Sequence, residues 1–579
     1  MRKYEVTTKS LWIDNACAPL YDNGKVFRQG RLYQNRDDEG KVVDFVALLR
    51  ACAKNKDLRK GATLHGRILT EGLLIQCLDA LVTMYAKCGD VAKAEKLFGM
   101  YRSRDVFTWT ALIAGYAHQG QGQQSLHHYE HMRREGLTPD EVTFNCVLKA
   151  CAMIAAIDKG VQIHDDISKH GFLQKNVMLG NSLVNMYAKC GALTRAEKVL
   201  EELPIRNVIT WSALIAGYAE HQKGEQAFEC FQKMQREGLV PDAVTFISLL
   251  KVCGSSGFAG NGELIHEEIS KHGLLGSDSA LDNALIDMYV KCGALDKARE
   301  VLDELPNRDV ISWCTLIAGY GQKREGEKAL QCFTQLLREG IHPNSVTYTC
   351  ILKACCGLGA ATEGEKLHDV ISKQGLLSTD IFLGNALINM YAKCGFLVKA
   401  AQVMAELPNR DVISWNTMMT GYIQKGECEQ ALASYEKLHD EGLSPDATTF
   451  LCVLTACSRL GLVDVAYKYF ETMIKVYGIM PCLQHYTCIV DLFGRAGQLQ
   501  KAVELMRRLP FSDTVVWSAL LGACQKWGDV SIGRWVFDHG IQSNKKDAAL
   551  YISRENTYSD AGLLHDADCI EFMCPEIKA

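Results

Sequence analysis

RNVITWSALIAGYAEHQKGEQAFECFQKMQREGLVPDAVTF, from Arg206 to Phe246, is one of four near copies of the same stretch. The other copies open with RDVFTWTALIAGYAHQG at Arg104, RDVISWCTLIAGYGQKR at Arg308 and RDVISWNTMMTGYIQKG at Arg410. A spacing of 102 residues separates five tryptophans, namely Trp109, Trp211, Trp313, Trp415 and Trp517. Such a regular period indicates one structural unit copied in tandem.

Each period contains three related segments. The period that starts at Val208 divides into Val208–Asp242, Ala243–Asp278 and Ser279–Asp309, of 35, 36 and 31 residues. Apolar residues of the first segment recur at helical spacing from Trp211 to Tyr218 and from Ala227 to Met234, which predicts two helices. We expect a turn containing Gly224 between them and an end of the second helix at Gly238. Because so short a hairpin cannot bury its apolar face alone, the copies must stack into an all-α solenoid.

Composition excludes several classes of protein. Of the 579 residues, 48% are apolar and 23% are charged, which is typical of a folded chain. No run of eighteen apolar residues occurs, so we expect no membrane span. The formal net charge of −5 argues against nucleic-acid binding through bulk positive charge but leaves room for a local basic groove.

The 24 cysteines recur at fixed positions in the period instead of pairing as a disulfide framework. They indicate small buried side chains in a reducing compartment. One series comprises Cys52, Cys151, Cys253, Cys355 and Cys457, and the other Cys88, Cys190, Cys292 and Cys394. No paired C-x-x-C motif is present, so we predict no metal site and no cofactor.

The last full period carries a family resemblance. SWNTMMTGYIQKGECEQALASYEKLHDEGLSPD, ATTFLCVLTACSRLGLVDVAYKYF and FLGNALINMYAKCGFLVKAAQVMAELPNRD closely resemble plant organellar pentatricopeptide repeat (PPR) proteins. The 35-36-31 rhythm resembles the subclass that alternates P, L and S motifs. LQHYTCIVDLFGRAGQLQKAVELMRRLPFSD resembles the terminal S motif, and VVWSALLGACQKWGDVSIGRWVFDHGIQ the first E motif. YISRENTYSDAGLLHDADCIEFM is similar to a second, degenerate E motif.

The resemblance implies a fold and a domain organisation. The fold is a right-handed superhelical solenoid of helix-turn-helix PPR motifs. Residues 1–42 form an N-terminal segment, residues 43–513 an array of about 14 motifs, and residues 514–579 the E-like motifs. The first 36 residues hold seven basic and three acidic residues, which is only weakly like a transit peptide. The family implies the mitochondrion, with the chloroplast as the alternative.

The resemblance also implies single-stranded RNA binding, with one base read by each coded repeat. The residues that do this in the family are a polar residue near the start of the first helix and the last residue of the repeat. We call these two residues a reading pair. The reading pairs of the P motifs are Thr110 with Asp140, Ser212 with Asp242, Cys314 with Asn344, and Asn416 with Asp446. Those of the S motifs are Asp79 with Asp105, Asn181 with Asn207, Asn283 with Asp309, Asn385 with Asp411, and Thr487 with Asp513.

Family rules associate Thr or Ser plus Asp with guanine, Asn plus Asp with uracil, and Asn plus Asn with a pyrimidine. The Asp79 and Cys314 pairs depart from these combinations, and the L-motif residues Ile247 and Leu451 cannot hydrogen-bond a base. An alternative role for the polar residues is helix capping, which Thr, Ser, Asn and Asp all favour.

The chain is not expected to be an enzyme. A cytidine deaminase needs H-x-E followed by P-C-x-x-C, which supply a zinc-bound water and a glutamate. HEE at His266–Glu268 has the first spacing, but no P-C-x-x-C follows, and HDD stands one period earlier at His164–Asp166. The resemblance therefore implies a factor that specifies C-to-U editing sites. Its partners would be a DYW-type cytidine deaminase acting in trans and multiple organellar editing factors.

Two other functions stay open. One is RNA binding for organellar splicing, transcript stability or translation. The other is a protein-binding helical scaffold of the tetratricopeptide type. Polar residues at repeat-specific positions favour either RNA function over the scaffold, and the E-like segment favours editing.

Overall fold

The computed structural model describes residues 36–100, 105–507, 514–543 and 552. Within them the chain forms thirty α-helices and one short 3-10 helix, η2 (Leu376–Ser378), and no strand. The prediction of an all-α array of helix-turn-helix motifs is confirmed. Of the expected N-terminal segment, residues 1–42, only residues 36–42 are described, at the start of the first helix. The second E-like motif lies outside the described residues apart from Ile552.

Even-numbered helices are the first helices of the motifs, and odd-numbered helices are the second helices. The first helices are α2 (Arg36–Asn55), α4 (Leu78–Cys88), α6 (Val106–His118), α8 (Glu141–Ile154), α10 (Val177–Lys189), α12 (Val208–Glu220), α14 (Ala243–Ser256), α16 (Ser279–Lys291), α18 (Val310–Gln322), α20 (Ser345–Leu358), α22 (Ile381–Lys393), α24 (Val412–Lys425), α26 (Ala447–Leu460), α28 (Leu483–Arg495) and α30 (Thr514–Trp527). The second helices are α3 (Leu58–Thr70), α5 (Val91–Gly99), α7 (Gly122–Arg134), α9 (Ile157–Lys169), α11 (Leu193–Glu202), α13 (Gly224–Arg236), α15 (Ala259–Lys271), α17 (Leu295–Glu304), α19 (Gly326–Arg338), α21 (Ala361–Lys373), α23 (Leu397–Glu406), α25 (Cys428–Asp440), α27 (Val463–Lys475), α29 (Leu499–Met506) and α31 (Val530–Ser543).

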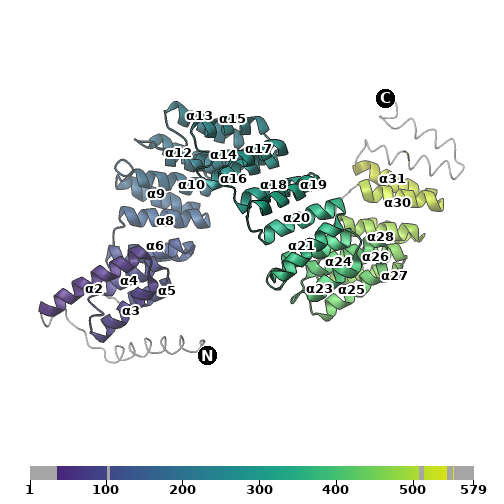
Figure 1. Cartoon of the computed structure of the whole chain (residues 1–579), viewed down its shortest axis with the longest axis horizontal. Coiled ribbons are helices and arrows are strands. Elements are labelled where there is room, and N and C mark those ends of the chain that lie inside the picture. Colours follow the sequence, from purple (N-terminus) through teal and green to yellow (C-terminus); the bar gives the residue numbers. More distant parts are fainter. Residues whose placement is uncertain (1–35, 101–104, 508–513, 544–551, 553–579) are drawn as a thin grey trace. The chain divides into compact units, whose positions relative to one another are not determined.

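The described residues fall into two compact units, divided between Leu249 and Leu250 inside α14. In each unit a first helix packs against its own second helix and against the first helix of the next motif, so the first helices form a continuous layer. In the N-terminal unit α4, α6, α8, α10 and α12 follow one another in this way, and in the C-terminal unit α16 to α30 do the same. Figure 1 shows the helical pairs stacked in chain order within each unit.

The motif formed by α12 and α13 explains why these residues make a hairpin. Trp211 and Tyr218 of α12 and Phe231 and Met234 of α13 are all buried, as their helical spacing predicts. A left-handed glycine, Gly238 (φ +73°), follows α13 and ends it. The expected position of Gly224 was wrong by a small margin: it is the first residue of α13 and not part of the turn.

Each P motif is closed by the same polar contact. The indole Nε1 of Trp211 donates to Glu237 Oε2 at 2.8 Å, at the end of the second helix, and Arg206 pairs with the other oxygen of Glu237 at 2.6 Å. Trp415 and Glu441 repeat the contact at 2.8 Å. This contact joins the start of the first helix to the end of the second, so the residues at the start of the first helix are held in place.

Neighbouring first helices approach closely at a small residue. A Cβ added to Gly217 in α12 would lie 2.5 Å from the Cβ of Ala188 in α10. Only glycine permits this approach without a shift of the backbone. The cysteines also lie between first helices: Cys52, Cys151, Cys253, Cys355 and Cys457 are buried as predicted. The second series is only half-buried, and Cys190 Sγ donates to the Cys151 carbonyl at 3.7 Å. In the described part of the chain, no helix is long and apolar enough to cross a bilayer.

Candidate functional site

The two members of each reading pair occupy equivalent places in successive motifs. Eight first members lie at the fifth residue of a first helix: Thr110, Asn181, Ser212, Asn283, Cys314, Asn385, Asn416 and Thr487. Asp79 differs, because α4 begins at Leu78 and Asp79 is its second residue. Eight second members stand directly before the next first helix: Asp105, Asp140, Asn207, Asp242, Asp309, Asn344, Asp411 and Asp446. Asp513 lies outside the described residues.

Four reading pairs are in direct contact. The amide Nδ2 of Asn416 donates to Asp446 Oδ1 at 3.0 Å, and the hydroxyl of Ser212 lies 3.0 Å from Asp242 Oδ1. The amide Nδ2 atoms of two S-motif asparagines do the same, Asn283 to Asp309 Oδ2 at 3.1 Å and Asn385 to Asp411 Oδ1 at 3.2 Å. In these pairs a donor and a carboxylate are held side by side at the junction of two motifs.

Two further pairs are linked through a threonine of the next helix. Thr110 Oγ1 lies 2.6 Å from Thr143 Oγ1, which bonds Asp140 Oδ1 at 2.7 Å. Cys314 Sγ lies 2.9 Å from Thr347 Oγ1, which in turn bonds Asn344 Oδ1 at 2.9 Å.

Two other first members, Thr487 and Asn181, have different surroundings. Thr487 Oγ1 donates to the carbonyl of Leu483 at 2.9 Å. Among the described residues Asn181 and Asn207 do not bond each other, and Asn181 Oδ1 is buried without a hydrogen-bond partner.

Helix capping, the alternative role, is found at the second members. Each of the eight accepts a hydrogen bond, at 2.7–3.0 Å, from the backbone N–H three residues later. Eight first members are the fifth residues of their helices and so lie beyond the cap position. Capping does not use up the carboxylates, because Asp411 and Asp446 receive their bonds from the described residues on Oδ1 only. The Oδ2 atoms can accept from a ligand.

The carboxylates of Asp309 and Asp411 stay ionised at neutral pH. Burial opposes ionisation of both groups, but hydrogen bonds from Ser312 and Asn283, and from Ser414 and Asn385, outweigh it and lower the pKa of each aspartate. Both therefore present acceptors only.

Two further sets of residues surround the pairs, and neither was predicted from the sequence. In each first helix that begins directly after the second member of a described reading pair, the third residue is a serine or a threonine. The second residue is apolar yet 52–80% exposed in ten first helices: Phe107, Val142, Met178, Ile209, Val244, Ile311, Val346, Phe382, Ile413 and Val515. Because residues three apart share a helix face, each of these side chains flanks a fifth residue. Their signal in the sequence was an apolar residue, where a surface position is expected, repeated in most copies.

Lysines lie further along the same face in three L motifs. Lys149, Lys251 and Lys353 are the ninth residues of α8, α14 and α20, four residues after the fifth position, and all are exposed. The net negative charge of the chain therefore coexists with positive charge on the face that carries the reading pairs.

The HEE sequence has a structural role. His266 Nδ1 lies 3.0 Å from the hydroxyl of Tyr289, and His164 makes the same contact with Tyr187. Glu268 pairs with Lys271 at 2.8 Å on the surface of α15. Among the described residues no group of His, Cys, Asp and Glu could hold a metal ion.

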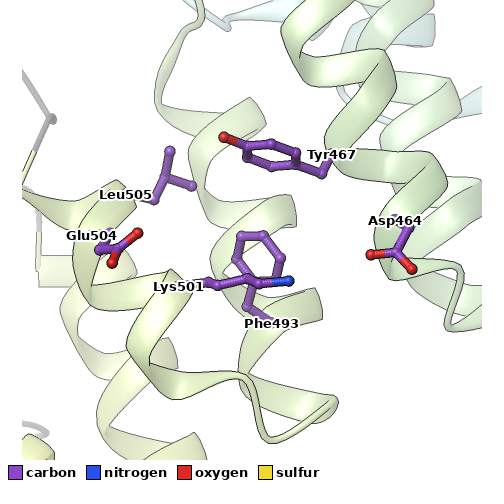
Figure 2. Close-up of a pocket in the computed structure, with 6 residues that line it drawn as sticks. All are labelled: Asp464, Tyr467, Phe493, Lys501, Glu504 and Leu505. Carbon is purple, nitrogen blue, oxygen red and sulfur yellow. The ribbon is translucent and has the colours of Figure 1, made fainter.

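A pocket of about 400 Å³ lies between α27, α28 and α29. Figure 2 shows Asp464 and Glu504 on opposite sides of it, with the rings of Tyr467 and Phe493 between them. None of its lining residues belongs to a reading pair.

Comparisons with known proteins agree with the repeat structure. A model described as the PPR repeat family matches residues 104–153, 206–255, 308–357 and 410–459. A model described as the PPR repeat matches residues 78–106, 181–208, 283–310, 346–376, 385–412, 448–476 and 485–511.

Curated relatives from Arabidopsis thaliana match nearly the whole chain. A putative pentatricopeptide repeat-containing protein is 34% identical over 526 residues, which cover 90% of this chain and 76% of the relative. A mitochondrial pentatricopeptide repeat-containing protein is 32% identical over 90% of this chain and 60% of its own length, and a chloroplastic one is 32% identical over 92% and 61%. The chain thus spans about three-fifths of the length of these last two relatives.

One solved structure resembles the chain over 99% of its length, with a TM-score of 0.59 and 18% identity. It is the crystal structure of the pentatricopeptide repeat protein PPR10 in complex with an 18-nt psaJ RNA element, of which 88% is covered. At this identity the likeness shows a common solenoid fold.

Proposed function

Because the chain belongs to the pentatricopeptide repeat family, we propose that its first-helix face binds single-stranded RNA and that each coded reading pair selects one base. The observation that carries the proposal is the side-by-side donor and carboxylate at motif junctions, as in Asn416 with Asp446. These residues differ between copies whose surrounding sequence is constant. The related PPR10 structure contains an RNA element, which supports the same ligand class for this chain.

The chemistry of the pairs matches the edges of bases. Uracil presents carbonyl oxygens and an N3–H, so an amide N–H of asparagine and a carboxylate oxygen complement it. In the same pose, cytosine would place its amino group against the asparagine N–H and its unprotonated N3 against the carboxylate. These contacts pair a donor with a donor and an acceptor with an acceptor. The exposed apolar second residues offer surfaces on which flat bases pack, and the L-motif lysines lie where phosphates can be neutralised.

The narrower proposal is that the bound RNA contains a C-to-U editing site and that this chain recruits a DYW-type deaminase in trans, together with multiple organellar editing factors. The E-like pair α30 and α31 directly after the repeats supports it. The site of action is an organelle, the mitochondrion in the first instance and the chloroplast in the second, as in the named compartments of the relatives.

The reading pairs specify a target. We align the RNA parallel to the chain and place the terminal pair, Thr487 with Asp513, four nucleotides before the edited cytidine, as is usual in this family. The target is then 5′-G-n-Y-G-n-U-n-n-U-U-n-G-n-n-n-C-3′. The adjacent uracils face the pairs of Asn385 and Asn416.

The RNA-binding proposal is tested with a synthetic RNA of this sequence and a second RNA in which every specified base before the final cytidine is changed. Fluorescence anisotropy should show tighter binding of the first RNA at equal salt, whereas equal affinity would contradict base selection. The editing proposal is tested by comparing organelle transcripts with the organelle genome in a plant line that lacks the protein. One cytidine that stays unedited, at the end of a matching sequence, is the expected result. Complete editing of all sites would refute this role and leave RNA binding intact.

A further inference from the structure

A buried hydroxyl accompanies each reading pair whose two members the structure describes. It belongs to the third residue of the next first helix, and we call it the N3 hydroxyl. Its carriers are Thr108, Thr143, Thr210, Thr245, Ser312, Thr347, Ser414 and Thr449, each at most 2% exposed. A buried hydroxyl must satisfy its hydrogen bonds within the protein, so its partners indicate its role.

In the pair of Asn416 and Asp446, the N3 hydroxyl closes a triangle. Thr449 Oγ1 lies 2.8 Å from Asn416 Oδ1 and 2.8 Å from Asp446 Oδ1, and Asn416 Nδ2 donates to Asp446 Oδ1 at 3.0 Å. The backbone N–H of Asp446 donates to the hydroxyl oxygen at 3.1 Å. The hydroxyl proton is therefore directed toward the two acceptor oxygens.

This triangle allows one orientation of the amide. Rotation of Asn416 by 180° about its terminal bond would place Oδ1 against the Asp446 carboxylate and Nδ2 against the hydroxyl. The first contact would bring two acceptors together, which is unfavourable in a buried site. In this orientation the Asn416 amide oxygen accepts from the Thr449 hydroxyl, and one of the two Nδ2 hydrogens remains to donate to a ligand.

A similar arrangement occurs in the two S-motif pairs that combine Asn with Asp, although Asn283 Nδ2 donates to Oδ2 of Asp309 and the hydroxyl bonds Oδ1. Ser414 Oγ lies 2.6 Å from Asn385 Oδ1 and 2.8 Å from Asp411 Oδ1. Ser312 Oγ lies 2.8 Å from Asn283 Oδ1 and 2.7 Å from Asp309 Oδ1. All three Asn–Asp pairs thus share the triangle.

The pair of Asn181 and Asn207 lacks the triangle. Thr210 Oγ1 bonds Asn207 alone, its carbonyl at 2.7 Å and its Oδ1 at 3.2 Å. Within the described residues Asn181 Oδ1 has no partner. The N3 hydroxyl also contacts both members of the Ser212 and Asp242 pair. Among the pairs that contain asparagine, however, the triangle accompanies Asn with Asp, the combination associated with uracil, and not Asn with Asn, the combination associated with a pyrimidine.

We propose that the N3 hydroxyl is a positioning residue for base choice: it holds the amide of the asparagine so that the pair offers a donor beside a carboxylate acceptor, which accepts uracil and rejects cytosine. Without the hydroxyl the amide can turn and offer its oxygen to the amino group of cytosine. This inference rests on the proposed RNA binding, because it concerns how a reading pair chooses between bases.

The test replaces Thr449 by valine, which keeps the shape of the side chain and removes the hydroxyl. The probes are two synthetic RNAs of the target sequence that differ only in U or C at the nucleotide opposite Asn416. Wild-type protein should prefer the U probe, and in Thr449→Val the U-to-C ratio of affinities should fall about fivefold, the factor expected for one neutral hydrogen bond. Thr449→Ser, which restores the hydroxyl as at Ser414, should keep the wild-type ratio.

The ratio separates positioning from structural damage, which would weaken both probes equally. If the U-to-C ratio of affinities in Thr449→Val equals that of the wild type, the inference is overturned. The proposed function still stands in that case, provided that the wild type prefers the U probe. No preference in the wild type at any position of the target would overturn both. Asp446→Asn identifies the nucleotide facing the pair, because it should move the preference there toward C. If Thr449→Val does not fold, the same U-to-C ratio of affinities is measured for Ser414→Ala, with probes that differ at the nucleotide opposite Asn385.

Discussion

At the scale of the residue, variation between copies marked side chains that we propose to face a ligand, whereas the residues that support them are constant and did not stand out. Asn416 stands where the other P motifs carry Thr, Ser or Cys, so the sequence could single it out, whereas Asn385 is shared with two other S motifs and was identified by its matching position. Thr449 and Ser414 are Thr or Ser in every copy, and so they resemble ordinary helix-start residues. Only the geometry places their hydroxyls against the amides, at 2.8 and 2.6 Å. When a residue is the same in every copy, the sequence alone does not show whether it caps the helix or positions another side chain.

Replacing Asn385 and Asn416 together by alanine removes two amides that are expected to donate to bases. At about 1 kcal/mol for each net hydrogen bond, the affinity for the target RNA should fall roughly thirtyfold. Thr417→Ala is the matched control, because its exposed hydroxyl bonds only its own helix, at the carbonyl of Ile413. A gel-shift titration measures the effect, and an unchanged affinity in the double variant would show that these positions do not read bases.

Replacing Lys149, Lys251 and Lys353 by glutamine should weaken all RNAs alike. Each lysine that neutralises a phosphate releases a counterion, which contributes about −0.7 to the slope of log affinity against log salt for a single strand. The slope should therefore become shallower by about two, while the preference of the target over the altered RNA stays the same. A slope equal to that of the wild type would mean that these lysines do not contact the RNA backbone.

At the scale of the element, helix ends were predictable because few residues can form them. Gly238 adopts the left-handed conformation after α13, and Asn207 caps α12 with a hydrogen bond to Thr210 N at 3.0 Å. The register of Gly224 was not predictable, because a glycine is found both in turns and at the first residue of a helix. The approach of α10 and α12 at Gly217 was also invisible, since the sequence does not show which residue faces it.

Gly217→Ala should lower the midpoint of thermal unfolding. The new methyl group would meet Ala188 Cβ at 2.5 Å, and overpacking of this kind costs about 1–3 kcal/mol, more than the gain of up to about 1 kcal/mol in helix propensity. The matched control is Gly66→Ala in α3, where nothing lies within 4 Å of the added Cβ, so its midpoint should rise. Circular dichroism measures the two unfolding midpoints. Equal shifts of the midpoint in the two variants would refute close packing at Gly217.

At the scale of the whole molecule, the period of 102 residues made the solenoid predictable, because a tandem array needs contacts only between neighbouring motifs. The same repetition places one side-chain contact in several motifs. The contact of a histidine with a tyrosine hydroxyl recurs from His65 with Tyr85 to His368 with Tyr391, at 3.0–3.1 Å. The same contact therefore occurs in four motifs.

The unfolding temperature should fall between about pH 7.5 and about pH 5.5. Burial lowers the pKa of His65, His164 and His266 in the folded chain below 6.5, their ordinary value. As the pH drops through 6.5, the unfolded chain binds protons that the folded chain does not, so the stability present above that pH is lost. Replacing His164 and His266 by glutamine, which keeps a partner for the tyrosines, should flatten the dependence. Scanning calorimetry that gives the same slope for variant and wild type would contradict this account.

Selection from a random pool of single-stranded RNA tests the central claim most directly. The purified full-length chain is incubated with the pool, bound RNA is recovered and sequenced over several rounds, and the Asn385→Ala, Asn416→Ala double variant is treated in parallel. The account predicts enrichment of U-U-n-G, with guanine and uracil further toward the 5′ end at the spacing of the target, and loss of the U-U element with the double variant. No enriched sequence, or the same sequence from both proteins, would contradict the claim that the reading pairs select bases.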